Sequence, residues 1–115
     1  SNQQYCGISA FHVIEHISFD ALFDFLILAH KKLVKGGVLI LETPNIENII
    51  VSSTSFYYDH THVQKVTREV LDKLLDYIGF SKIIFLPLHP IKPKPKGAVE
   101  RFLFGSQDMG IIAYK

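Results

Sequence analysis

A helical segment between two short apolar runs is the feature that most constrains the fold of this chain. The runs at residues 5–11 and 38–41 read as buried strands, and the second is a continuous run of β-branched residues and leucine. Between them apolar residues recur with helical spacing over 19–34, with Ser18 as a plausible N-cap and a glycine pair at 36–37 as the stop signal. Strand, helix and strand in this order predict a right-handed parallel crossover, the unit from which α/β sheets are built.

The second half of the chain continues the alternation around one clear helix at 68–78, which Thr67 caps and Gly79 ends. Pro44 is expected to end the ladder of the strand at 38–41. The remaining predicted elements are one or two helical turns at 46–53, a loop at 54–65, a strand at 80–88, an exposed lysine–proline connection at 89–98, an element of either type at 99–103, and a short strand at 110–114.

Composition narrows the class of protein. Hydrophobic residues make up 48% of the 115 positions, so a core can form, and the net charge of +1 gives no electrostatic footprint for nucleic acid or anionic lipid. No apolar run reaches the roughly 20 residues that a membrane helix needs. A single cysteine, Cys6, fits a reducing compartment. We therefore expect a cytoplasmic protein that binds neither nucleic acid nor membrane.

Two histidines and a carboxylate follow the first predicted strand, in the order His12-Val-Ile-Glu15-His16. On one helix this sequence would match the H-x-x-E-H signature of inverted zinc peptidases. At the exit of a strand, the same residues would stand at the edge of an α/β sheet where ligands bind. The apolar run before them and the cap at Ser18 leave room only for a short loop, which favours the second interpretation. A zinc hydrolase stays the less favoured alternative.

With the elements in this order, the chain resembles the C-terminal half of class I S-adenosylmethionine-dependent methyltransferases, in the group with a "viEH" motif (types 11, 12 and 23). The resemblance implies a Rossmann-like α/β half-domain with strand order 4-5-7-6, helices D and E, and an antiparallel last strand. It rests on five pieces in the right order, Phe11-His-Val-Ile-Glu-His16, Leu33-Val-Lys-Gly-Gly-Val38, Glu42-Thr-Pro-Asn45, Asp59-His-Thr-His62, and the helix ending Gly79-Phe80.

The chain also departs from that family. It contains no Gly-x-Gly for the loop after strand 1, and nothing before Tyr5 supplies the acidic residue that holds the cofactor ribose. The family's aspartate near the start of strand 4 is replaced by the sequence Tyr5-Cys6-Gly7. We therefore expect residues 1–115 to be a single partial domain that is inactive alone. An uncovered edge on the first strand predicts self-association, with two copies of the strand pairing across a two-fold axis.

The resemblance also implies roles for residues beyond the first strand. The backbone at Ala10, Phe11 and His12 would face the methionine part of S-adenosylmethionine. His16 would point toward the transferred methyl group and act as a general base on an acceptor hydroxyl. Glu15 is assigned to the substrate, and the alternative is that it caps a backbone amide or pairs with a lysine. Some relatives hold a divalent metal here, and two imidazoles with a carboxylate could do likewise.

The loop around Asp59-His-Thr-His62 would fold over the acceptor side in the same family. His62 is the second candidate base, and Asp59 and Tyr58 are candidates for substrate contact. The structural alternative is that Asp59 forms an Asx turn while His62 bonds a carbonyl group. The predicted function is O-methylation of a small molecule or glycan by the complete domain. The alternative is a non-catalytic α/β interaction domain.

Overall fold

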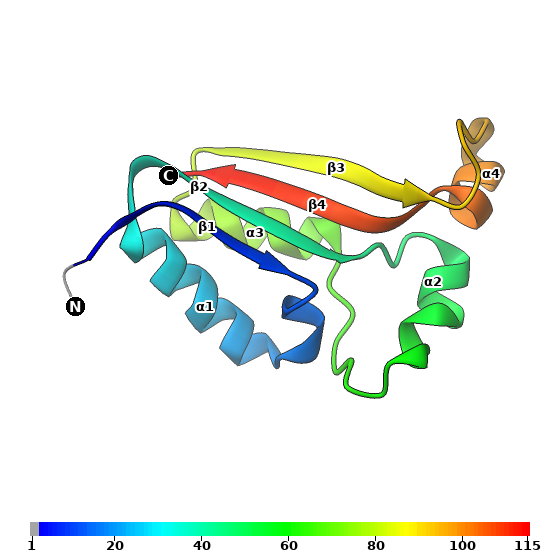
Figure 1. Ribbon diagram of the computed structural model, residues 1–115, viewed down its shortest axis with the longest axis horizontal. Helices are drawn as coiled ribbons and strands as arrows, with labels where there is room; N and C mark the ends of the chain where they lie inside the picture. Colours follow the sequence, from blue (N-terminus) through cyan, green and yellow to red (C-terminus); the bar gives the residue numbers. More distant parts are fainter. Residues whose placement is uncertain (1–2) are drawn as a thin grey trace.

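The computed structural model describes residues 3–115 as four strands, four α-helices and two 3₁₀ helices. Figure 1 shows the strands side by side, with α1 and α3 along the sheet and α2 and α4 at one end. In chain order the elements are β1 (Tyr5–Phe11), η1 (Ile14–His16), α1 (Phe19–Lys32), β2 (Leu33–Pro44), α2 (Ile49–Ser53), η2 (Ser55–Tyr58), α3 (Arg68–Ile78), β3 (Lys82–Pro90), α4 (Gly97–Phe104) and β4 (Ser106–Tyr114).

The sheet has the order β1-β2-β4-β3. β1 and β2 are parallel, while β4 lies between β2 and β3 and runs antiparallel to both. This confirms the predicted order 4-5-7-6 and the antiparallel last strand. Because β1, β2 and β3 run in one direction, their carboxyl ends meet at the same edge, together with η1, η2 and α2 (Figure 1).

The core lies between the sheet and the pair α1 and α3. Alternate side chains of the two central strands point into it, as the two-residue period of a strand requires. The helices contribute the positions of their apolar stripes. The buried cluster contains Leu22, Leu26 and Ala29 of α1, Leu71 and Leu75 of α3, and Leu33, Leu39, Leu41, Met109, Ile111 and Ala113 of the sheet. The opposite face is less covered, since the paired residues Ile40, Ile112 and Ile84 are only half-buried.

The first helix and the second strand differ from their predicted bounds. α1 ends at Lys32, and Leu33 is already extended and paired with Tyr5. The glycine pair therefore does not stop the helix. It lies inside β2, where Gly36 has a φ of +82° and allows an irregularity of the strand. Leu33 is fully buried in the core. This burial favours the extended conformation of Leu33 over the helical one that its spacing predicts.

β2 also continues through Pro44, contrary to prediction. The amide of Asn45 donates to the carbonyl of Gln107 on β4, so the alternation of the ladder turns the nitrogen of Pro44 toward the β1 side. There β1 has already ended, because Phe11 pairs with Glu42. No partner at that position needs the N–H that proline lacks.

The C-terminal elements differ from their predicted bounds, because β3 is shifted by two residues and β4 is longer than predicted. β3 runs on to Pro90, and β4 begins at Ser106 rather than at 110. The segment at 99–103 is helical and belongs to α4, which begins inside the predicted lysine–proline connection. β3 tolerates Pro87 and Pro90 because it is an edge strand. No helix among the described residues is long and apolar enough to cross a membrane.

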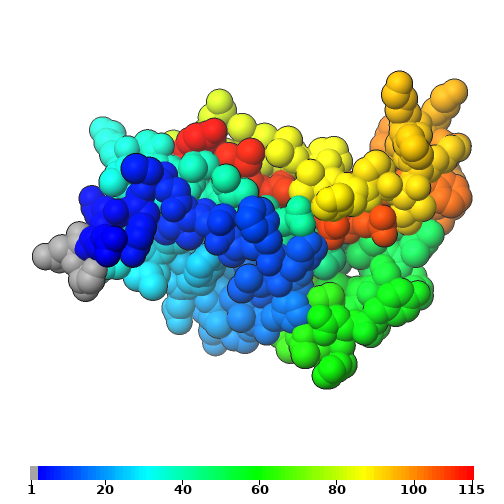
Figure 2. Space-filling view, in the orientation of Figure 1, coloured from blue at the N-terminus to red at the C-terminus, as the bar shows by residue number. Residues whose placement is uncertain are grey.

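The two edges of the sheet differ in their protection. β3 carries Lys82 and two prolines, which are residues that discourage pairing with another chain. β1 has the sequence YCGISAF, without proline or charge, and most of it is exposed. Figure 2 shows β1, in dark blue, lying on the surface of the molecule. Beside it a cavity of about 460 Å³ is lined by apolar groups that include Ile8, Phe25 and Leu28.

We predict that the chain associates through this edge and that Ser9→Lys prevents the association. Ser9 is exposed in the middle of β1, and two lysines facing each other across a two-fold axis would repel. Sedimentation velocity should show a larger species for the wild type and a monomer for the variant. Ser53→Lys, on the exposed end of α2, is the matched control and should behave as the wild type. A monomeric wild type would contradict the prediction.

Candidate functional site

Glu15 lies at the centre of the sheet edge where the parallel strands end. It belongs to η1, and its side chain is completely buried. Thr43 Oγ1 donates to its Oε1 at 3.4 Å, and Nδ1 of His12 lies 3.2 Å from its Oε2. A buried carboxylate needs such partners, since leaving it unpaired costs several kcal/mol. The predicted alternative of a lysine partner is therefore not what the structure shows.

The backbone of Glu15 fixes the distant loop that carries the second pair of candidate residues. Its carbonyl accepts from the amides of Val63 (2.8 Å) and Gln64 (3.2 Å). The Gln64 side chain then donates to the carbonyls of Ile14 (3.3 Å) and Ile17 (2.7 Å). These bonds tie the segment after η2 to η1, and they bring His62 beside His16 with ring centroids 4.7 Å apart.

The hydrogen bonds of His16 define which of its nitrogens carries a proton. Nδ1 lies 3.2 Å from the carbonyl oxygen of Thr61 and 2.8 Å from Oγ1 of the same residue. Since that hydroxyl donates to Asp59 Oδ1 (2.5 Å), it accepts from His16. Nδ1 is therefore the donor, and Nε2 presents a lone pair when the ring is neutral. This Nε2 lies 3.8 Å from Asp59 Oδ2.

His62 is arranged in the same way. Its Nδ1 lies 2.6 Å from the carbonyl oxygen of Phe56, so Nδ1 carries the proton and Nε2 is free to accept. Nε2 lies 3.7 Å from Asp59 Oδ2. The ring also packs on Phe56, with centroids 4.7 Å apart. The carbonyl bond was the structural alternative for His62, but here it also orients the other nitrogen toward the site.

Hydrogen-bond acceptors without protons of their own thus face one another at this site. The lone pairs of His16 and His62 converge with the carboxylates of Asp59 and buried Glu15 nearby. Ligand atoms of Glu15, His16 and His62 all lie within 4.8 Å of one another. Two imidazoles with a carboxylate are suitable ligands for a divalent metal.

Asp59 both faces this cluster and forms a turn. Its Oδ1 accepts from the amide of Thr61 at 2.9 Å, which is the Asx turn named as the structural alternative. The hydroxyl and the amide of Thr61 hold the pKa of the exposed Asp59 carboxyl below its ordinary value. Tyr58, the other predicted acceptor contact in this loop, is 80% exposed.

The other predicted residues stand at the exit of β1. Ala10 is half-buried, Phe11 is 58% exposed and His12 follows directly with a positive φ of 55°. The segment from His12 to His16 contains a 3₁₀ turn and not an α-helix, and its two imidazoles bind different partners. The helical geometry that an inverted zinc peptidase needs is therefore absent from this segment.

The structure adds a group that the sequence did not reveal. Nε2 of His12 lies 2.5 Å from Glu42 Oε2 and 3.9 Å from Asp108 Oδ1, and His89 Nδ1 lies 2.7 Å from Asp108 Oδ2. Burial alone would lower the pKa of His12. The hydrogen bond to Glu42, with the charges of Asp108 and Glu15, outweighs burial and raises that pKa above its ordinary value.

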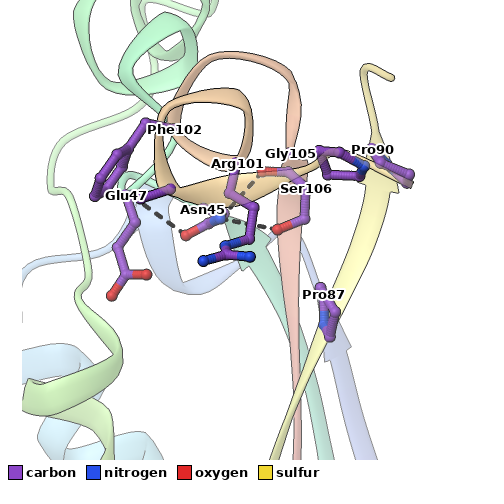
Figure 3. A pocket seen from close by; sticks show the side chains of 10 residues that line it. Asn45, Glu47, Pro87, Pro90, Arg101, Phe102, Gly105 and Ser106 are labelled. Carbon is purple, nitrogen blue, oxygen red and sulfur yellow. Dashed lines mark hydrogen bonds between the residues drawn. The ribbon is translucent and has the colours of Figure 1, made fainter. Parts of the chain in front are cut away.

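Two cavities open near this edge. One of about 210 Å³ is lined by His12, His62 and Asp108 among others, so it connects the two polar groups. A larger one of about 560 Å³ lies under α4, between Asn45 and the prolines of β3. Figure 3 shows Arg101 of α4 reaching toward Asn45, which donates to the carbonyl and the hydroxyl of Ser106 at 3.0 and 2.9 Å.

The strand order of the sheet indicates which class of protein this chain resembles in fold. The sheet with its antiparallel last strand has the fold of class I S-adenosylmethionine-dependent methyltransferases. The chain matches a SAM-dependent methyltransferase from Archaeoglobus fulgidus with a TM-score of 0.86 and 28% identity, over 98% of this chain and 60% of that one. Neither a family model nor a curated protein sequence matches the chain.

More distant structures show the same fold. A SAM-dependent methyltransferase from Thermotoga maritima matches with a TM-score of 0.70 and 14% identity, over 98% of this chain and 56% of that one. The methyltransferase domain of bacterial CtHen1 matches with a TM-score of 0.64 and 19% identity, over 99% of this chain and 54% of that one. The chain thus spans less than two thirds of the length of each of these proteins.

We predict that His12 titrates above its ordinary pKa in metal-free protein and that Glu42→Gln lowers its pKa. A raised pKa means that the ion pair stabilises the fold fully below about pH 6.5, and that this contribution disappears as the pH rises through the raised value. A histidine NMR titration in the presence of a chelator measures both effects. Glu47→Gln changes another carboxylate of the same edge and should leave the His12 pKa unchanged. An unshifted His12 in the wild type would contradict the assignment.

Proposed function

We propose that this chain is the acceptor-side part of an S-adenosylmethionine-dependent methyltransferase that methylates an oxygen of a small molecule or glycan. The single observation that carries this proposal is the convergence of Glu15, His16 and His62 at the exit of β1. In open α/β sheets this is the edge where ligands bind. The similarity to methyltransferase structures supports the reaction class.

The reaction requires an acceptor oxygen to approach the methyl carbon in line with the bond to sulfur. That carbon–oxygen bond forms as the carbon–sulfur bond breaks, and the sulfonium leaves as S-adenosylhomocysteine. The acceptor hydroxyl must lose its proton. Neutral Nε2 of His16 or of His62 can take it, because their Nδ1 protons are fixed by Thr61 and Phe56. Holding the reactants in line is the other contribution of the protein.

A divalent metal fits the same residues, with Glu15, His16 and His62 as ligands. When bound, it would lower the pKa of an acceptor hydroxyl that reaches it. A nitrogen that binds a metal cannot also take a proton, so the two roles of Nε2 exclude each other. The fixed Nδ1 protons orient both rings toward one point in either case.

The cofactor is proposed to lie along Ala10, Phe11 and His12, with its methionine part toward η1. Binding to this chain alone is expected to be weak, because the sequence has no Gly-x-Gly loop. The cavity of about 210 Å³ between His12 and His62 supports an acceptor position next to the methyl group. Tyr58 and Asp59 would contact the acceptor from the loop. Glu15 would hold the imidazoles or the metal from its buried position in η1.

Titration of S-adenosylhomocysteine, followed by NMR of backbone amides, tests the cofactor position. We expect weak binding with shifts confined to the end of β1, at Ala10, Phe11 and His12. Adenosine alone lacks the amino acid part and should not produce these shifts. An absence of shifts at these amides would contradict the proposed position, and tight binding would contradict the expectation that the chain is inactive alone.

Titration of Zn²⁺ into His16→Ala and His62→Ala tests the metal. Removing one ligand should weaken binding at this cluster by at least about tenfold, since even the loss of an outer partner of a ligand has such an effect. His60→Ala changes the exposed histidine of the same loop and should bind as the wild type does. If all three variants bind Zn²⁺ equally, the imidazoles act as bases and not as ligands.

A further inference from the structure

We propose a second divalent-cation site, formed by His12, Glu42 and Asp108 and separate from the Glu15–His16–His62 cluster. Ligand atoms of these three residues lie within 4.8 Å of one another. Three strands bring them together, since His12 directly follows β1, Glu42 lies in β2 and Asp108 lies in β4. The inference does not depend on methyl transfer, because it concerns the ligand set alone.

The strand register brings the two carboxylates together. Glu42 pairs with Gly110 and Pro44 pairs with Asp108, so Glu42 and Asp108 are diagonal neighbours on the same face of the sheet. Glycine at 110 leaves the position directly opposite Glu42 without a side chain. Two like charges placed together in this way repel, and a cation between them removes the repulsion.

His12 completes the set with a nitrogen that already points at both carboxylates. Nε2 lies 2.5 Å from Glu42 Oε2 and 3.9 Å from Asp108 Oδ1. Nδ1 lies 3.2 Å from the buried Glu15 carboxylate. Histidine ligands of metals commonly donate their other ring N–H to a carboxylate, which fixes the ring and makes it a stronger ligand. His12 has this arrangement, with Nε2 as the ligand nitrogen.

Asp108 is oriented by a partner in the same manner. Its Oδ2 accepts from Nδ1 of His89 at 2.7 Å, which leaves Oδ1 turned toward His12 and Glu42. His89 comes from β3, so all four strands contribute to the site or to its support. Carboxylates that bind metals are commonly held by a hydrogen bond from a neighbouring residue, as His89 holds Asp108.

The backbone of both histidines is strained. His12 has a φ of 55° and His89 a φ of 52°, in the left-handed region that residues other than glycine seldom adopt. Each such residue costs of order 1–3 kcal/mol, and such conformations concentrate at functional sites. Two residues with such a backbone, one near each carboxylate oxygen of Asp108, support a functional site at this sheet edge.

The ligand set indicates the kind of cation. One imidazole and two carboxylates suit Zn²⁺ and similar first-row divalent ions. With a neutral His12 the three ligands carry a net charge of −2, which a dication neutralises. Three protein ligands leave a coordination position open, and the cavity of about 210 Å³ that His12 and Asp108 line gives a small molecule access to it.

Zn²⁺ binding, counted by metal analysis after dialysis and by calorimetric titration, tests the proposal. All proteins would carry Cys6→Ser, because the exposed thiol is itself a zinc ligand. The parent should bind two equivalents, and Glu42→Gln should bind one. Glu47→Gln, the matched control on the same edge, should keep both. His16→Ala should lose only the first cluster, and the double variant Glu42→Gln, His16→Ala should bind none.

The outcomes separate the two sites. A parent that binds one equivalent, lost in His16→Ala and kept in Glu42→Gln, overturns the second site and leaves the first. A parent that binds one equivalent with the opposite pattern supports the second site and contradicts the first. If circular dichroism shows that Glu42→Gln does not fold, Asp108→Asn replaces it as the test variant, since this substitution is also isosteric. No Zn²⁺ binding by a folded parent overturns the proposal.

Discussion

The buried carboxylate of Glu15 is the interaction on which the rest of the sheet edge depends. Its side chain cannot be left unpaired, so His12 and Thr43 must reach it from the ends of β1 and β2. Its backbone carbonyl accepts hydrogen bonds from the amides of Val63 and Gln64. These bonds join two parts of the chain that are almost 50 residues apart in sequence. One residue therefore fixes both the strand ends and the loop that brings His62 to His16.

Much of the fold follows from the sequence because its signals are local. The N-caps at Ser18 and Thr67 and the left-handed Gly79 are found where the sequence predicts them, and each acts within a few residues. The strand order followed from the family resemblance. The strand ends were less predictable, because pairing decides them. Pro44 stays in β2 only because β1 has ended beside it, which the sequence near Pro44 does not show.

The candidate site was predictable in part for the same reason. His12, Glu15 and His16 are neighbours in the sequence and form a recognisable motif, and His62 came from the family resemblance. Glu42 and Asp108 became neighbours only through the antiparallel register of β2 and β4. A shift of that register by one residue would turn either side chain to the other face. Asp108 and His89 have no sequence signal that would have indicated their role.

The central position of β4 has a consequence for synthesis of the chain. β1, α1 and β2 can pair as soon as residues 5–44 have been made, but the inner edge of β2 then lies open. β3 has no strand to pair with until residues 106–114 emerge, because β4 joins it to β2. The nascent chain therefore exposes two apolar strand edges until β4 is translated, and during that interval these edges are open to aggregation and to binding by chaperones.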